Sequence, residues 1–196
     1  MGIESRKYSG WGIGMFDFNN DGWKDLFTAN SDVNDLIDLF GSTHYKQTNS
    51  LFANLGNGTF RDVSLEAGFN LARAHRGSAF ADFDNDGNID VVVSALGEPA
   101  ELWQNVSPDA NRWIALKLTG SGSNREGIGA KIRLGKQFNH VTTAVGYASS
   151  SPSTVHFGTG KQEKIDRIEI RWPSGAVQVL RGVATNQVLE VHEPSK

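Results

Sequence analysis

Short stretches in which apolar and polar residues alternate recur along the whole chain. β-branched and aromatic residues are frequent within them, and clusters of Gly, Asn and Asp separate them. This two-residue period, interrupted by turn residues, is typical of β-strands. Only residues 32–39 and 64–67 favour a helix, and both segments are short. The sequence therefore predicts an all-β fold.

The first half of the chain contains an internal repeat. When the sequence is shifted by 65 positions, residues 12–26 superpose on residues 77–91, and LFAN at 51–54 is echoed by LWQN at 102–105. The repetition stops near residue 105, where VSPDA has the composition of a linker. We therefore expect two repeats in residues 1–105 and a β-sandwich-like module of roughly seven strands in residues 106–196.

Charge divides the chain at the same point. Residues 1–105 carry 7 Lys and Arg against 15 Asp and Glu, whereas residues 106–196 carry 12 against 7. The basic half has no dense Lys/Arg cluster interleaved with aromatic residues, so nucleic acid is not an expected partner. No apolar run is long enough for a membrane span. The chain has no cysteine, which excludes disulfides and thiolate metal sites.

Each repeat contains the pattern D-x-[D/N]-x-D-G-x-x-D between two expected strands. In such a turn the side chains at positions 1, 3 and 5 converge, and a glycine at position 6 allows the positive φ that folds the chain back. Position 7 then offers its backbone carbonyl, and position 9 closes the shell of oxygen atoms that a hard divalent cation requires. The candidate metal ligands are Asp17, Asn19, Asp21, Trp23 and Asp25, then Asp82, Asp84, Asp86, Asn88 and Asp90.

The alternative interpretation is that these segments are ordinary Asp-Gly hairpin turns. A turn needs one Asp, however, and several carboxylates within nine residues repel one another unless a cation is bound. The loops are not EF-hands, because Thr28 and Val93 stand where that loop needs Glu. We expect about two Ca²⁺ ions per chain, with Mg²⁺ less favoured, and weaker binding where Asn19 replaces Asp84.

These residues also carry a family resemblance. Residues 77–96 and 49–63 resemble the FG-GAP/VCBS repeats of integrin-α-type β-propellers. The second half resembles the ASPIC/UnbV domain of cartilage-acidic-protein-like proteins, in SNR at 123–125, GIGA at 127–130, HFGTG at 156–160 and WPSG at 172–175. The resemblance implies that the two repeats are propeller-blade-like, with calcium in their hairpin loops. It also implies an extracellular, periplasmic or cell-surface location, although the chain shows no signal peptide.

Two repeats are too few for a propeller, which closes with about 4–8 blades. Uncovered sheet faces and edges favour association. The sequence therefore predicts either a fragment of a longer propeller protein or a chain that completes its core by self-association or through its second module, and a start directly on a repeat favours the fragment.

Other candidate residues are fewer. Asn124 and Arg125, before a Gly-rich turn, are a weak candidate anion cradle, and His75 and His156 are the histidines worth testing, although a structural role is the default for both. Trp113 and Trp172 are expected in the core of the second module. Residues 149–153, a serine-rich run, are expected to form a flexible or turn-forming loop.

Two functions remain open. The first is a calcium-stabilised interaction or scaffold module whose surface meets a protein or a glycan. The second is a metal-dependent hydrolase of phosphate or sulfate esters, in which Arg125, His75 or His156 steadies the developing charge. The chain lacks the G-x-S-x-G and H-E-x-x-H motifs. A loop that supplies five or more oxygens leaves little room for substrate, so the sequence favours a module without enzymatic activity but does not decide the question.

Overall fold

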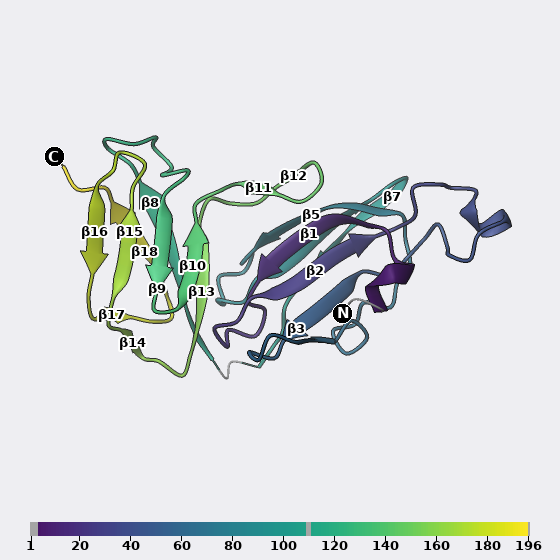
Figure 1. The fold of residues 1–196 in the computed structure, drawn as a ribbon, viewed down its shortest axis with the longest axis horizontal. Helices are drawn as coiled ribbons and strands as arrows, with labels where there is room; N and C mark the ends of the chain where they lie inside the picture. The colour runs from purple at the N-terminus through teal and green to yellow at the C-terminus, as the bar shows by residue number, and fades with distance from the viewer. Residues whose placement is uncertain (1–3, 109–110, 196) are drawn as a thin grey trace.

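A computed structural model describes residues 4–108 and 111–195 (Figure 1). The described chain is almost entirely β, which confirms the predicted class; its helical segments are the short 3₁₀ turns η1 (Glu4–Lys7) and η2 (Ile37–Leu39). Within these ranges no helix has the length and apolar character needed to cross a membrane. Residues 4–105 are called the repeat half below, and residues 111–195 the C-terminal half.

The repeat half contains two antiparallel sheets. The first has the order β1-β2-β3-β4 and the second the order β5-β6-β7. The predicted 65-residue offset holds residue for residue, because Phe16 pairs with Asp25 as Ala81 pairs with Asp90, and β1 and β5 share an irregularity at the same place. The strands are β1 (Gly10–Phe16), β2 (Asp25–Asn30), β3 (Ser50–Asn54), β4 (Phe60–Asp62), β5 (His75–Ala81), β6 (Asp90–Ala95) and β7 (Glu98–Trp103).

The two sheets meet along β1 and β5. Glycine is required there, since a Cβ at Gly12 would lie 2.5 Å from Ser78 Oγ and one at Gly14 would lie 2.2 Å from the Phe80 ring. This close approach encloses an apolar core between the sheets. Its buried members are Phe27, Ala29, Leu51, Ala53, Val63, Phe69, Phe80, Ile89, Val91 and Val93.

The C-terminal half is a sandwich of two sheets, ordered β10-β9-β15-β16 and β13-β8-β18. Both sheets contribute to one core that contains Ile114, Ile132, Phe157 and Ile168, and Trp172 is buried in it as predicted. The strands outnumber the roughly seven expected, because several two-residue pairs leave no periodic signal in the sequence. They are β8 (Arg112–Thr119), β9 (Lys131–Leu134), β10 (Gln137–His140), β11 (Ala144–Val145), β12 (Ser149–Ser150), β13 (Val155–Gly160), β14 (Lys164–Ile165), β15 (Ile168–Arg171), β16 (Val177–Leu180), β17 (Val183–Ala184) and β18 (Gln187–His192).

The hairpin of β11 and β12 extends from the C-terminal half across β1 and β5 (Figure 1). We call residues 144–151 the arm. Ser149 Oγ accepts a hydrogen bond from the Ser78 N–H at 3.0 Å, and Ser151 Oγ accepts one from the Phe80 N–H at 2.9 Å. The serine-rich run predicted as a flexible or turn-forming loop is therefore an ordered contact between the two halves.

The two sheets of the repeat half do not close a propeller within the described residues. Ile13 and Met15 on β1 and Leu102 on β7 are large apolar side chains that remain about half exposed or more. The C-terminal half lies beside one end of these sheets, at the ends of β1, β2, β5 and β6 where the acidic loops are found (Figure 1).

Candidate metal centre

The first acidic loop (residues 17–25) joins β1 to β2, and the second (residues 82–90) joins β5 to β6. Asp17 accepts hydrogen bonds from the backbone N–H of positions 5 and 6, at 3.0 and 2.7 Å. Asp82 accepts the equivalent pair at 3.1 and 2.9 Å. The position-6 glycines have φ of +95° and +90°, as the turn requires. The two loops therefore share one backbone geometry.

The second loop gathers three carboxylates. Asp82, Asp84 and Asp86 each offer one oxygen atom, and these atoms all lie within 4.8 Å of one another. In the first loop the middle position is an amide, and Asn19 Nδ2 donates to Asp21 Oδ2 at 3.1 Å. The convergence predicted for positions 1, 3 and 5 is thus present in the second loop with a full set of carboxylates.

The Asp at position 9 accepts two backbone hydrogen bonds in each loop, and its predicted place in the metal shell stays a prediction. Asp25 Oδ2 accepts the Phe18 N–H at 3.0 Å and its Oδ1 accepts the Asn54 N–H at 2.7 Å. Asp90 accepts the matching bonds from the backbone N–H groups of Phe83 and Asn105. It lies outside the group of three convergent carboxylates. Both residues tie the loop to the next strand.

The asparagines that complete this tie, Asn54 and Asn105, are site residues that the sequence argument missed. Their position at the end of LFAN and LWQN was the available signal. Asn54 Nδ2 donates to the Lys24 carbonyl, and Asn105 Nδ2 donates to the carbonyls of Phe18 and Ile89. Asn105 therefore connects the second repeat to the first.

Burial leaves the carboxylates short of compensating charge. Burial raises the pKa of Asp17 to about 7 against the lowering effect of the Gly22 N–H, and it raises the pKa of Asp25 to about 6. The pKa of Asp82 is also raised, again mainly by burial. Lys24 stands near Asp17, but burial lowers its own pKa. A cation among these oxygens would offset the burial of their charge, so the residues present fit a divalent ion.

The position-7 residues differ in their surroundings. Trp23 is 48% exposed, and its indole lies against Gly56, where a Cβ would approach it to 2.9 Å. Asn88 is buried, and its Nδ2 donates to Asp86 Oδ2 at 3.1 Å. The use of the Trp23 and Asn88 backbone carbonyls as metal ligands stays a prediction.

The C-terminal half contacts the second loop through Trp113 and His156. The Trp113 indole covers Gly87 so closely that a Cβ there would lie 1.7 Å from Nε1. His156 stacks on Trp113 and its Nε2 donates to the Gly87 carbonyl at 3.0 Å. Burial lowers the pKa of His156 to about 4, so the ring is neutral. The expectation that Trp113 fills the sandwich core was wrong, because it packs between the halves.

The C-terminal half also covers the first loop. Gly158 on β13 lies against it, and a Cβ at Gly158 would lie 2.1 Å from Asp17 Oδ2. The Gly160 N–H donates to the Asn20 carbonyl at 2.9 Å, and Asn111 Nδ2 donates to the Asn19 carbonyl at 2.9 Å. Both acidic loops therefore lie at the joint between the two halves.

Two family models match the chain in the order that the motifs predict. The FG-GAP-like repeat matches residues 17–93, which contain both acidic loops, and ASPIC and UnbV matches residues 120–196. The chain carries an FG-GAP-like repeat followed by an ASPIC and UnbV domain.

The curated relatives bear one name. The chain is 29% identical over 128 residues to human Cartilage acidic protein 1, and the aligned region covers 60% of this chain and 19% of that protein. It is 28% identical over 128 residues to the Xenopus tropicalis protein of the same name, in an alignment that covers 60% of this chain and 20% of that protein. It is 43% identical over 60 residues to the mouse protein, in an alignment that covers 30% of this chain and 9% of that protein. The aligned region thus spans about a fifth of the human and frog relatives.

The ASPIC and UnbV domain does contain an anion cradle, but Asn124 and Arg125 do not form it. The consecutive N–H groups of residues 121–123 donate to Glu193 Oε2 at 2.7–2.8 Å, and the hydroxyls of Ser123 and Ser174 donate to its Oε1. Asn124 instead bonds to the Ile128 backbone, and Arg125 is exposed. The cradle is filled by a carboxylate of the same chain, which a sequence separation of 70 residues concealed.

His75, the remaining candidate, has a structural environment in the FG-GAP-like region. It is fully buried; its Nδ1 lies 3.0 Å from the Gln47 carbonyl and its Nε2 lies 3.3 Å from Glu101 Oε2. His75, His156 and Asn124 therefore bond to different partners and do not form one site. Of the three, only His156 contacts an acidic loop.

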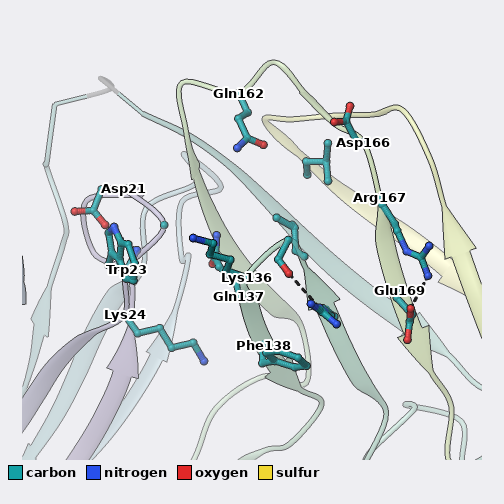
Figure 2. Close-up of a pocket in the computed structure, with 15 residues that line it drawn as sticks. Asp21, Trp23, Lys24, Lys136, Gln137, Phe138, Gln162, Asp166, Arg167 and Glu169 are labelled. Carbon is teal, nitrogen blue, oxygen red and sulfur yellow. Dashed lines mark hydrogen bonds and ion pairs between the residues drawn. The ribbon is translucent and has the colours of Figure 1, made fainter. Parts of the chain in front are cut away.

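A cleft of about 870 Å³ opens between the first loop of the FG-GAP-like repeat and the ASPIC and UnbV domain. Figure 2 shows Trp23 and Lys24 on one side and Arg167 with Glu169 on the other. Arg167 and Glu169 form an ion pair at 2.6 Å, and the exposed Phe138 ring lies beneath the Arg133 guanidinium, 5.2 Å from its carbon. The cleft therefore offers aromatic faces together with charges of both signs.

Proposed function

We propose that residues 17–25 and 82–90 each bind one Ca²⁺ ion and that the protein is a calcium-stabilised interaction module. The observation that carries the proposal is the duplication of one carboxylate-lined backbone geometry, with burial that raises the pKa of Asp17 to about 7. Ca²⁺ is favoured over Mg²⁺ because the loops offer many oxygen atoms without octahedral geometry.

The ions have a structural role in this proposal. Each loop joins the paired strands of one sheet and contacts the C-terminal half, so an ion would hold strands and halves together. A hydrolase would need Arg125, His75 or His156 beside an open cation. Only His156 reaches a loop, and its Nε2 is engaged by the Gly87 carbonyl. No specific observation favours catalysis.

We place the protein outside the cell or at the cell surface, and we divide it near residue 105. The location rests on the FG-GAP-like and ASPIC/UnbV matches, and extracellular modules commonly bind Ca²⁺ with dissociation constants of about 10⁻⁴–10⁻³ M.

The proposed partner is a protein or a glycan. The cleft lined by Trp23, Lys24 and Phe138 is the surface proposed to meet it, since aromatic and charged groups are typical of recognition sites. Uncovered faces such as that of Ile13 and Met15 favour further repeats or a second copy as neighbours.

Calorimetric titration of the EDTA-treated protein with Ca²⁺, and separately with Mg²⁺, tests the proposal. We expect about two Ca²⁺ per chain, weaker Mg²⁺ binding and a rise in melting temperature by linkage. Asp86→Ala is expected to remove one ion. Asp62→Ala, which removes an exposed carboxylate at the end of β4, is the matched control and should leave two. Absence of Ca²⁺ uptake by the folded protein would overturn the proposal.

A further inference from the structure

Position 4 of the two acidic loops is asparagine in both, yet the two side chains have different environments. Asn20 and Asn85 both adopt a left-handed backbone, with φ of 58° and 63°. Asn85 is exposed, whereas Asn20 is 3% exposed. Identical residues at matched positions therefore provide an internal control for what the buried side chain does.

Asn20 reaches across to the second loop. Its Nδ2 donates to the Gly87 carbonyl and to Asn88 Oδ1, each at 3.1 Å. Its Oδ1 is buried and has no hydrogen-bond donor within the described part of the chain. The Asn20 side chain is thus held in place by the backbone carbonyl of Gly87 and the side-chain oxygen of Asn88 in the second loop.

Asn20 and Gly87 also contact the C-terminal half. The Gly87 carbonyl that accepts from Asn20 also accepts from His156 Nε2, at 3.0 Å. The Asn20 carbonyl accepts from the Gly160 N–H at 2.9 Å. Asn20 and Gly87 are therefore the point at which both acidic loops and the C-terminal half meet.

We propose that Asn20 couples the two cation sites, so that an ion in the second loop strengthens binding in the first and secures the docked C-terminal half. The inference rests on the proposed calcium binding. It adds that the loops act together and that the joint between the halves depends on their occupancy.

The sign of the coupling follows from the geometry. An ion held by Asp82, Asp84 and Asp86 restricts residues 86–88, which carry the two acceptors of Asn20. Once those acceptors are fixed, less conformational entropy is lost when Asn20 and its left-handed backbone are ordered for the first loop. The coupling is reciprocal, because linkage requires each ion to affect the other equally.

The decisive experiment uses the full chain and Ca²⁺ alone. The affinity of the first loop is measured by calorimetry with the second loop intact and with Asp84→Ala, which removes its central carboxylate. We expect the affinity of the first loop to fall on the order of tenfold when the second loop is impaired. In an Asn20→Gly background the fall should disappear, and in an Asn85→Gly background it should persist. Glycine suits the positive φ at both positions.

A second measurement follows the joint directly. The amide of Gly160 is protected by its bond to Asn20, so its hydrogen exchange reports docking. Addition of Ca²⁺ to the EDTA-treated wild type and to Asn85→Gly should slow this exchange on the order of tenfold. The change should be much smaller in Asn20→Gly. The amide of Leu116, inside the sandwich, should not change.

The outcomes separate the two proposals. If two Ca²⁺ ions bind independently and Gly160 exchange does not respond, calcium binding stands and the coupling is overturned. The coupling is also overturned if Asn20→Gly and Asn85→Gly behave alike. If the folded protein takes up no Ca²⁺, both proposals fail together.

Discussion

The loop at residues 17–25 buries its first carboxylate, Asp17, against the C-terminal half, whereas the loop at residues 82–90 exposes two of its three convergent carboxylates. The backbone hydrogen bonds that the first carboxylate of each loop accepts nevertheless match position by position. Asp17 is 5% exposed and its pKa is raised to about 7; Asp84 is exposed and belongs to a complete trio of carboxylates. The local sequence therefore sets the turn, and tertiary contacts set the electrostatic environment of each loop.

The largest expected difference between the loops lies at position 6. Gly87→Ala places a Cβ within 1.7 Å of the Trp113 indole in addition to straining a positive φ, and we expect a loss of ~3 kcal/mol or more in unfolding free energy. Gly22→Ala strains a similar φ but meets its nearest neighbour at 3.4 Å, so ~1–2 kcal/mol is expected. Urea unfolding measures both. Equal losses would contradict the tight contact between Trp113 and the second loop.

Asn54, at the end of β3, and Asn105, just after β7, should also differ. Asn105→Ala removes side-chain bonds to two carbonyls, one of them Phe18 in the other repeat, and should lower the unfolding free energy by ~2 kcal/mol. Asn54→Ala removes a bond to the Lys24 carbonyl within its own repeat and should cost ~1 kcal/mol. If Asn54 proved the more important residue in urea unfolding, Asn105 would not be the link between the repeats.

Exchange of the position-3 residues tests whether carboxylate count governs affinity. Asp84→Asn should weaken Ca²⁺ binding in the second loop on the order of tenfold, and Asn19→Asp should strengthen binding in the first by a similar factor, because each changes one ligand charge. Calorimetry of each single variant, with the double exchange as control, gives the ranking. Unchanged affinities would mean that burial, not charge, distinguishes the loops.

The last expected effect concerns a carboxylate outside the loops. Burial tends to raise the pKa of Glu193, but the hydrogen bonds from residues 121–123 and 174 outweigh it and lower the pKa to about 2 from an ordinary value of 4.5. The unfolded chain therefore binds the proton first as pH falls. The contribution of the ionised Glu193 carboxylate to the free energy of unfolding is fully present above about pH 4.5 and is lost as pH falls towards 2.

The stability difference between wild type and Glu193→Gln should accordingly shrink across that window. Glu190→Gln, which removes an exposed partner of Lys117, is the matched control and should differ little from wild type at any pH. Denaturation of all three proteins at a series of pH values makes the comparison. A Glu193→Gln difference that stays constant between pH 4.5 and 2 would contradict the lowered pKa.

Much of the fold was predictable because its signal is local and repeated. The 65-residue offset placed β1 and β5 in register, and the turn chemistry of D-x-[D/N]-x-D-G placed both loops between paired strands. The burial of Trp172 was expected because a large aromatic side chain most often fills a core. Local pattern was sufficient wherever the partner residue lay in the same hairpin.

What sequence reasoning missed depends on contacts between distant segments. Asn20 and Asn85 are equivalent in sequence, but the Asn20 side chain is buried and bonds to the second loop, 67 and 68 residues away, whereas Asn85 is exposed. Trp113 was expected in the sandwich core as a large aromatic residue, yet its side chain faces Gly87. Glu193 reaches its cradle from 70 residues away, and two-residue strands such as β11 carry no periodic pattern. Distance along the chain, not the chemistry of the residues, limited the prediction.

The arm has a consequence for assembly. An edge strand is a template for strand addition, because its free N–H and C=O groups invite another chain to continue the sheet, and β5 is the edge strand of its sheet. The arm blocks two of those N–H groups with the hydroxyl oxygens of Ser149 and Ser151. A hydroxyl satisfies the donor without presenting the alternating groups that a further strand would read. Polymerisation through this edge is therefore stopped by side chains that end the sheet instead of extending it.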